Sequence, residues 1–187
     1  MISIRQLAGA LNGLWLLYKF DARAWDYFDR SQQGFWASFI VAVALAPVQI
    51  AHRLLQFSPK AGGLDFVPYA VVQVLSYSLT WTLFPFLMLF IARLLERESR
   101  YFAYMVPYNW MQLPLAVPLF TLQLLTDVHL LPPAVLGFLN PVVMVAFIVY
   151  GTFVAGIGLQ VATGTALGLV VLDYVVGLLA DGMIGKI

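Results

Sequence analysis

One acidic side chain stands out because it lies in the middle of a long apolar segment. Between Leu130 and Ala180, Asp173 is the only charged residue. An Asp at the centre of a membrane span costs about 2.5 to 3.5 kcal/mol on insertion scales. Such an acid is either a proton or cation site, or a neutral group that hydrogen-bonds to a neighbouring helix. A proton path normally needs a second titratable group, and the sequence places none at the same depth.

Amides and prolines mark a second segment, the apolar run from Tyr101 to Leu125. At about 100° per residue, the amides fall on one helix face and the prolines on the opposite face. The amides are Asn109, Gln112 and Gln123, and the prolines are Pro107, Pro114 and Pro118. A proline bends a helix and frees the carbonyl four residues back, here those of Ala103, Trp110 and Pro114. The pattern predicts a kinked helix whose amides lie on its concave side. These amides either line a pore or hydrogen-bond to other helices, and Asn109 and Gln112 are candidate partners of Asp173.

The remaining residue types do not favour catalysis. His52 and His129, with Asp127 near them, could bind a metal, but they lack the spacing of a zinc motif. Cysteine is absent, which excludes disulfides and thiolate chemistry. The glycines lie in apolar segments rather than in a phosphate loop, and no serine has the context of a nucleophile. We therefore expect no catalytic residue, no cofactor and no resident metal.

The composition of the chain indicates which solvent surrounds these residues. The chain has 187 residues, of which 62% are hydrophobic and 10% are charged, with a mean hydropathy of +0.89. Soluble domains contain about 25% charged residues, so the lipid bilayer is the expected surrounding of this chain. A net charge of +1 gives no surface for nucleic acid. The predicted fold class is an all-α, polytopic transmembrane helical bundle.

The N-terminal part, residues 1–33, is predicted to be a cytoplasmic or interfacial helical segment. Apolar residues recur at helical spacing over its first half: Ile4, Leu7, Leu11, Leu14 and Tyr18. This spacing predicts an amphipathic helix, lying either in the membrane interface or on the protein's own surface. Asp21 and Ser31 are typical N-caps, the first for a short helix and the second for the first span.

Residues 34–187 are predicted to form a transmembrane domain of five spans. The apolar segments are long enough to cross a hydrocarbon core about 30 Å thick. They run approximately over residues 35–55, 67–92, 101–125, 134–159 and 163–182, with the last turn near Gln160 to Thr165. Gln73, Ser76 and Thr80 form a polar stripe on the second span, which is expected to face another helix.

Small residues four positions apart characterise the last two spans. The pairs are Gly151 with Ala155, Thr152 with Gly156, and Gly164 with Gly168. Such spacing lets helix backbones approach closely, which predicts a tight hairpin.

Basic residues predict the orientation in the membrane. Most lie in the N-terminal segment and the second loop: Arg5, Lys19, Arg23, Arg30, Arg93, Arg97 and Arg100. The other side holds Arg53, Lys60 and Lys186. Because basic residues concentrate on the cytoplasmic side, the N-terminus is expected in the cytoplasm and the C-terminus outside, in a bacterial inner membrane.

The segment LWLLYKFDARAWDYFDRSQQGFWASF, followed by five closely spaced spans, resembles small membrane proteins of the Yip domain family. The resemblance implies the five-span topology, with a short aromatic helix leading into the first span. Eukaryotic members of that family act in vesicle traffic and bind lipidated small GTPases through a longer cytosolic region. This chain has only residues 1–33 there, so the resemblance implies topology and assigns no functional residue.

Two functions fit these observations. The first is a non-catalytic membrane protein that acts by contact, as an accessory or assembly subunit of a membrane complex or as a self-associating scaffold. The second is a small channel or a proton- or cation-coupled carrier that uses the third span and Asp173. A carrier needs a water-accessible cavity bordered by Asn109, Gln112 and Asp173, whereas a subunit needs a dry bundle with an exposed apolar or small-residue face.

Overall fold

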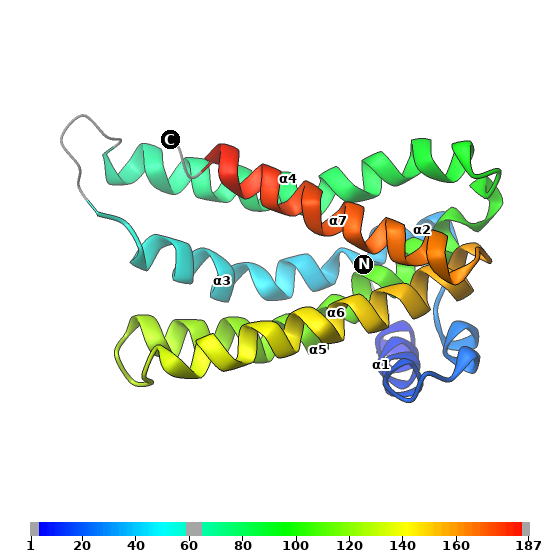
Figure 1. Ribbon diagram of the computed structural model, residues 1–187, viewed down its shortest axis with the longest axis horizontal. Helices are drawn as coiled ribbons and strands as arrows, with labels where there is room; N and C mark the ends of the chain where they lie inside the picture. Colours follow the sequence, from blue (N-terminus) through cyan, green and yellow to red (C-terminus); the bar gives the residue numbers. More distant parts are fainter. Residues whose placement is uncertain (1–3, 59–64, 185–187) are drawn as a thin grey trace.

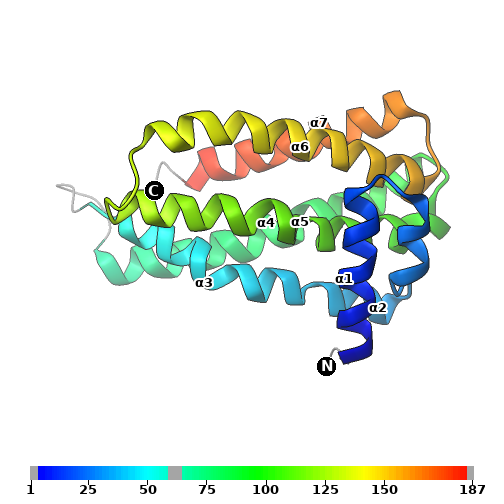
Figure 2. The same ribbon diagram turned by 90° about the horizontal axis from the view of Figure 1, so that it is seen from below.

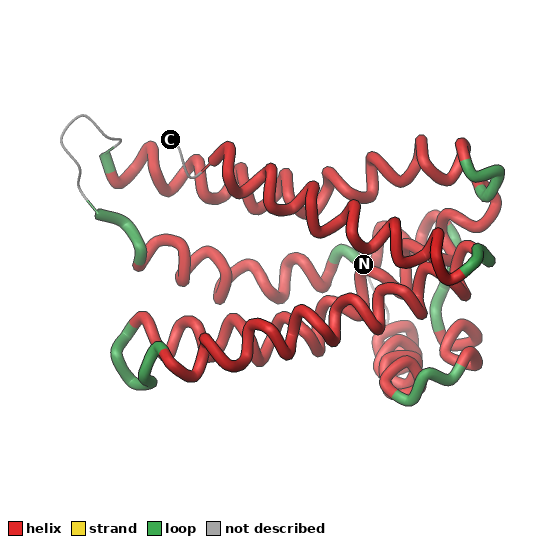
Figure 3. The backbone as a smooth tube through the Cα atoms, in the orientation of Figure 1, coloured by secondary structure: helices red, strands yellow, loops and turns green. Residues whose placement is uncertain are grey.

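The computed structural model describes residues 4–58 and 65–184, which contain helices and no strands (Figures 1 and 3). Lys60 and Lys186, used above to predict orientation, lie outside these described residues. Helices α3, α4, α5, α6 and α7 run lengthwise, and the loops between them alternate between the two ends of the bundle (Figure 1). The all-α prediction is confirmed.

The N-terminal segment forms three short elements at one end of the bundle. They are α1 (Ile4–Tyr18), the 3-10 helix η1 (Ala22–Tyr27) and α2 (Gln32–Ser38). Both predicted N-caps are confirmed, since the Asp21 side chain accepts from the Arg23 N–H and the Ser31 hydroxyl accepts from the Gly34 N–H at 3.1 Å. Helix α1 lies crosswise to the long helices (Figure 2).

Only one face of α1 packs on the protein. Ala10, Gly13 and Leu17 are buried against the segment that follows. Most of the predicted apolar stripe points elsewhere, because Ile4 is 87% exposed and Leu11 is 49% exposed. One of the two expected placements is therefore seen, since one face lies on the protein; the placement in the membrane interface stays a prediction.

The long helices match the predicted segments closely. They are α3 (Ile40–Leu55), α4 (Phe66–Leu94), α5 (Tyr101–Asp127), α6 (Ala134–Leu159) and α7 (Thr163–Ile184). The predicted first span is interrupted at Phe39, where α2 ends and α3 begins. The predicted last turn occurs at Gln160, which adopts a left-handed conformation with φ of 55°.

Four helical stretches in the described residues are long and apolar enough to cross a membrane. They are Gln32–Leu55, Phe66–Leu94, Ala134–Leu159 and Thr163–Ala180. Helix α5 is of similar length but less apolar than these. Its position explains the difference, because α5 packs against α1, α2, α3, α4 and α6. A helix surrounded by protein can carry polar side chains that a lipid-facing helix cannot.

The first half of the predicted proline segment is the buried centre of the fold, whereas Pro114 and Pro118 are exposed. Helix α5 continues through Pro107, Pro114 and Pro118 without interruption, so the predicted kink stays a prediction. Every residue from Ala103 to Met111 is buried. The carbonyl of Ala103, which Pro107 deprives of its helical donor, accepts a hydrogen bond from the Trp25 indole nitrogen at 2.7 Å. The N-terminal segment is thereby attached to the first turn of the central helix α5.

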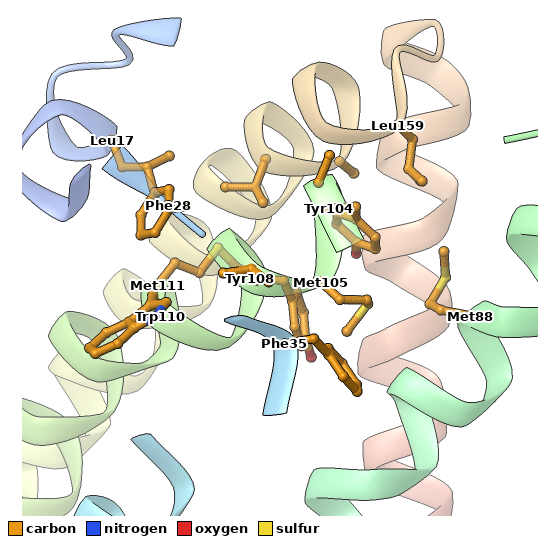
Figure 4. Packing of buried hydrophobic residues seen from close by; sticks show 14 of the residues in the cluster. Leu17, Phe28, Phe35, Met88, Tyr104, Met105, Tyr108, Trp110, Met111 and Leu159 are labelled. Carbon is orange, nitrogen blue, oxygen red and sulfur yellow. The ribbon is translucent and has the colours of Figure 1, made fainter. Parts of the chain in front are cut away.

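Side chains from several helices meet around α5 to form the apolar core (Figure 4). Tyr104 and Met105 of α5 lie among Phe35 of α2, Met88 of α4 and Leu159 of α6. The backbones of α5 and α6 approach each other closely at Gly158. A Cβ on that glycine would lie 2.7 Å from the Tyr104 Cα and 3.0 Å from the Ala103 oxygen. Only glycine allows this approach.

Candidate functional site

Asp173 makes one hydrogen bond, to a residue that the sequence did not single out. The hydroxyl of Tyr108 on α5 donates to Oδ2 of Asp173 on α7 at 2.6 Å. Asp173 is half-buried, and within the described residues no hydrogen bond to its Oδ1 is found. The carboxyl group therefore keeps one oxygen for a further donor.

This carboxyl group borders a cleft of about 210 Å³ where α3, α4, α5 and α7 meet. The polar side chains that line it come from all four helices: Gln49 of α3, Thr80 of α4, Tyr108 and Gln112 of α5, and Asp173 of α7. The rest of the lining is apolar, including Trp81 and Phe84. We call this set the polar cleft.

Helical spacing explains why α5 contributes two polar side chains to the polar cleft. Tyr108 and Gln112 are four residues apart, so they lie on the same face of the helix. Thr80 lies on α4 with its hydroxyl donating to the Ser76 carbonyl at 3.0 Å, which leaves its hydroxyl oxygen as an acceptor. The four-residue spacing from Gln112 could have identified Tyr108 as a residue of the polar cleft. No sequence pattern indicated that Gln49 belongs to it.

The predicted amide cluster does not gather as a unit. Gln112 borders the polar cleft with Asp173. Asn109 is fully buried elsewhere, and its Nδ2 donates to the Ser38 hydroxyl at 2.8 Å. Gln123 is not part of the cleft lining. The side-chain oxygens of Asn109 and Gln123 are both buried without a hydrogen-bond partner in the described part of the chain.

The amide of Asn109 instead connects the central helix to α2. The Ser38 hydroxyl that accepts from Asn109 donates in turn to the Phe35 carbonyl at 2.7 Å. This chain of two hydrogen bonds lies beside Phe39, where the first span is interrupted. An interhelical hydrogen bond was one of the two uses expected for this amide, and it joins α5 to α2 rather than to α7.

A second polar contact lies at the end of the bundle opposite α1 and α2. His52 of α3 and Asp127 of α5 pair through Nδ1 and Oδ2, and Gln56 lies 3.1 Å from the other ring nitrogen of His52. His129 follows in the loop with φ of 61°. Within residues 4–58 and 65–184, no three metal-ligating side chains come together.

The small residues of α6 and α7 divide into two groups. Gly151 faces α7, since its added Cβ would lie 3.0 Å from Val170, and Ala155 is fully buried. Gly156 has ordinary contact distances to Ala166. Gly164 and Gly168 have open space around them. Close packing of the hairpin thus uses the α6 residues, and Gly164 and Gly168 lie on the exposed side of α7.

Electrostatic interactions outside the long helices stabilise the N-terminal segment. Arg23 binds Asp21 with contacts down to 2.5 Å, and these hydrogen bonds lower the pKa of Asp21. Hydrogen bonds from Ser31, and then from Gln6 of α1 at 3.2 Å, lower the pKa of Asp29. Both carboxylates are held in their charged form.

Comparison of the chain with protein-family models, with curated proteins and with solved structures finds no match. The resemblance to the Yip domain family therefore stays a prediction, and function has to be argued from the polar cleft and its surroundings.

Proposed function

We propose that this protein is a non-catalytic membrane subunit that acts by contact, and that the polar cleft receives a polar or basic side chain of a partner helix. The partner is another membrane protein or a second copy of the chain. In this proposal the chain crosses a bacterial inner membrane five times, with α5 as the third span, bent at its prolines. Its N-terminus lies in the cytoplasm and its C-terminus outside.

The observation that carries the proposal is the unused oxygen of Asp173. A half-buried carboxyl group in a span needs donors, and Tyr108 supplies one of them. The cleft of about 210 Å³ beside it has room for one side chain. Acids within membranes pair with basic or polar groups of neighbouring helices, so a partner helix is a suitable source of the second donor.

The same cleft supports a second candidate, the proton- or cation-coupled carrier. Gln112 and Asp173 border it as that function requires, although Asn109 does not. A proton relay uses a chain of titratable groups, and the described lining contains no second acid, no histidine and no basic residue. We therefore propose the non-catalytic subunit as the first function and the carrier as the second.

Intact-complex mass spectrometry of the protein released from native membranes tests the first proposal. We expect the wild-type chain to carry a bound partner or second copy, and the Asp173→Asn variant to lose it. The matched control is Asp26→Asn, at an exposed acid in η1, which should keep the partner. A wild-type chain found solely as a monomer would overturn the proposal.

Flux measurements in liposomes test the second candidate. A carrier would move protons or cations in its wild-type form and would lose this flux after Asp173→Asn. Zero flux in both forms would exclude a carrier function and would not bear on the proposal that the protein is a membrane subunit.

The five-span topology can be tested separately because the chain has no cysteine. Single cysteines placed at Asp26, Ser58, Arg97, His129 and Gln160 should react with an impermeant thiol reagent alternately from one side and the other. We expect Ser58→Cys and His129→Cys to react from outside. Labelling of Arg97→Cys from outside would refute the proposed order of spans.

A further inference from the structure

An apolar groove lies between the crosswise helix α1 and the sides of α5 and α6. Its volume is about 450 Å³, whereas an apolar cavity of roughly 150 Å³ is enough to hold benzene. Leu11 and Trp15 form one wall, Pro114 and Leu115 of α5 form the second, and Ala146 of α6 forms the third. Apolar walls of this kind favour an apolar ligand.

The walls of the groove place it at the edge of the membrane region. Helix α6 is one of the four stretches suited to crossing a membrane, and α1 crosses the bundle near the end where α6 turns into α7 (Figures 1 and 2). Leu11, 49% exposed, and Trp15, 58% exposed, belong to the side of α1 that does not pack on the protein. A lipid chain running alongside α6 would enter the groove from the bilayer without crossing water.

A cation lies beside one wall residue of the groove, Trp15. Lys19 Nζ is 4.5 Å from the centroid of the Trp15 ring, and no carboxylate of the described residues lies within ion-pair distance of it. Arg23, close by in sequence, is paired with Asp21. The ammonium group of Lys19 has three donors, so it can bind an anion while it stays over the ring.

We propose that this groove binds one acyl chain of an anionic phospholipid and that Lys19 pairs with that lipid's phosphate. The apolar walls match the chain, and the ammonium group matches the headgroup. A phospholipid is the membrane component in which an apolar chain and an anionic group are joined at the level of an interfacial helix. The proposal does not depend on the role of Asp173.

Tyr150 gives the groove a fixed shape. Its hydroxyl donates to the Tyr18 carbonyl at 3.1 Å, and its ring stacks on Phe20 with centroids 4.7 Å apart. Because α6 thereby holds the C-terminal end of α1, the two walls keep their separation. The site is formed before a lipid arrives, which reduces the ordering cost of binding.

Lipid titration of the full chain in detergent, followed by native mass spectrometry, tests the proposal. The probes are phosphatidylglycerol, which is anionic, and phosphatidylcholine, which has no net charge. We expect the wild type to bind a first phosphatidylglycerol more tightly than a first phosphatidylcholine. Equal affinities would refute the headgroup assignment.

Two variants, each with a control, test the acyl-chain site and the headgroup site separately. Ala146→Phe fills the groove and should weaken the first phosphatidylglycerol about tenfold or more, because several buried methylenes lose their contact. Val145→Phe, at an exposed position on another face of the same helix, adds an aromatic ring outside the groove and should bind as the wild type does. The Lys19→Gln variant should bind phosphatidylglycerol and phosphatidylcholine with equal affinity. The control variant Arg97→Gln should keep the preference for phosphatidylglycerol.

Melting temperatures in lipid-free detergent show whether each variant is folded. If Ala146→Phe does not fold, Leu11→Trp fills the groove from the α1 wall and replaces it in the test. Unchanged affinity in a folded groove-filling variant, or a retained preference in Lys19→Gln, would overturn the proposal.

Discussion

The Tyr108 hydroxyl and the Asp173 carboxyl join the central helix to the last one, at 2.6 Å. Helix α7 packs mainly on α6 and α4, so this hydrogen bond is a direct polar link between α7 and α5. Asp173 borders the polar cleft together with Gln49, Thr80 and Gln112. One of its two carboxyl oxygens is therefore held by a tyrosine that has no charge of its own.

Removing this hydroxyl should destabilise the protein measurably. Tyr108→Phe leaves the half-buried Asp173 carboxyl group without its donor. A fully buried polar group that loses its partner costs about 1 to 3 kcal/mol, so we expect a loss at the lower end of this range. Thermal unfolding in detergent measures the loss. Tyr174→Phe, on the exposed side of α7, is the control and should melt with the wild type. In the Asp173→Asn background the effect of Tyr108→Phe should shrink, because the amide makes a weaker hydrogen bond than a carboxylate.

The hydrogen bond from Trp25 to Ala103 predicts a rescue. Trp25→Phe leaves the Ala103 carbonyl buried and unpaired, at a cost of about 1 to 3 kcal/mol. In a Pro107→Ala background the restored N–H of residue 107 can donate to the same carbonyl. Trp25→Phe should therefore cost much less there. A double-mutant cycle by thermal unfolding measures this coupling, and equal costs in the two backgrounds would contradict the explanation.

Two glycines of the last hairpin should respond in opposite ways to the same substitution. Gly158→Ala forces a Cβ to 2.7 Å from the Tyr104 Cα, and overpacking of this kind costs about 1 to 3 kcal/mol. Gly168→Ala meets open space and should be neutral or slightly stabilising, since Ala favours helix over Gly. Unfolding temperatures of the two variants decide the matter; a harmless Gly158→Ala would mean that α5 and α6 can separate without loss.

The lowered pKa of Asp29 predicts a dependence on pH in the N-terminal segment. A carboxyl group whose folded pKa lies below its ordinary value of 3.8 stabilises the fold above that value and loses this contribution as pH falls through the folded pKa. Wild type should therefore melt above Asp29→Asn at neutral pH, and the gap should close below about pH 4. Melting curves across this range measure it, with Asp26→Asn as the control. A gap that is constant with pH would rule out the ionised carboxylate as its cause.

The helices of this protein could be predicted well because each one has a local signal. Long apolar runs set the extents of α4 and α6, and Asp21 and Ser31 marked helix starts through their side-chain oxygens. The turn at Gln160 was predictable because an apolar run of that length cannot cross a bilayer once. These signals need no knowledge of how the helices pack.

The partners of the polar groups could not be predicted in the same way. Asn109 and Gln112 lie on the same helix face in a wheel projection, yet one contacts Ser38 and the other borders the cleft with Asp173. Neighbouring faces of a central helix meet different helices, and the sequence does not record which. Gly158 was missed for the same reason, since its close approach is to α5 and not to its hairpin partner α7.

Helix α5 also determines when the helices of this protein can assemble during synthesis. The chain emerges from the N-terminus, yet α1, α2, α3 and α4 all pack against a helix that is made after them. Until Trp25 meets the Ala103 carbonyl and Ser38 meets Asn109, α2 and α3 lack their main contacts, which are with α5. These two helices can therefore complete their packing only after α5 has been made, so assembly of the bundle is a late event.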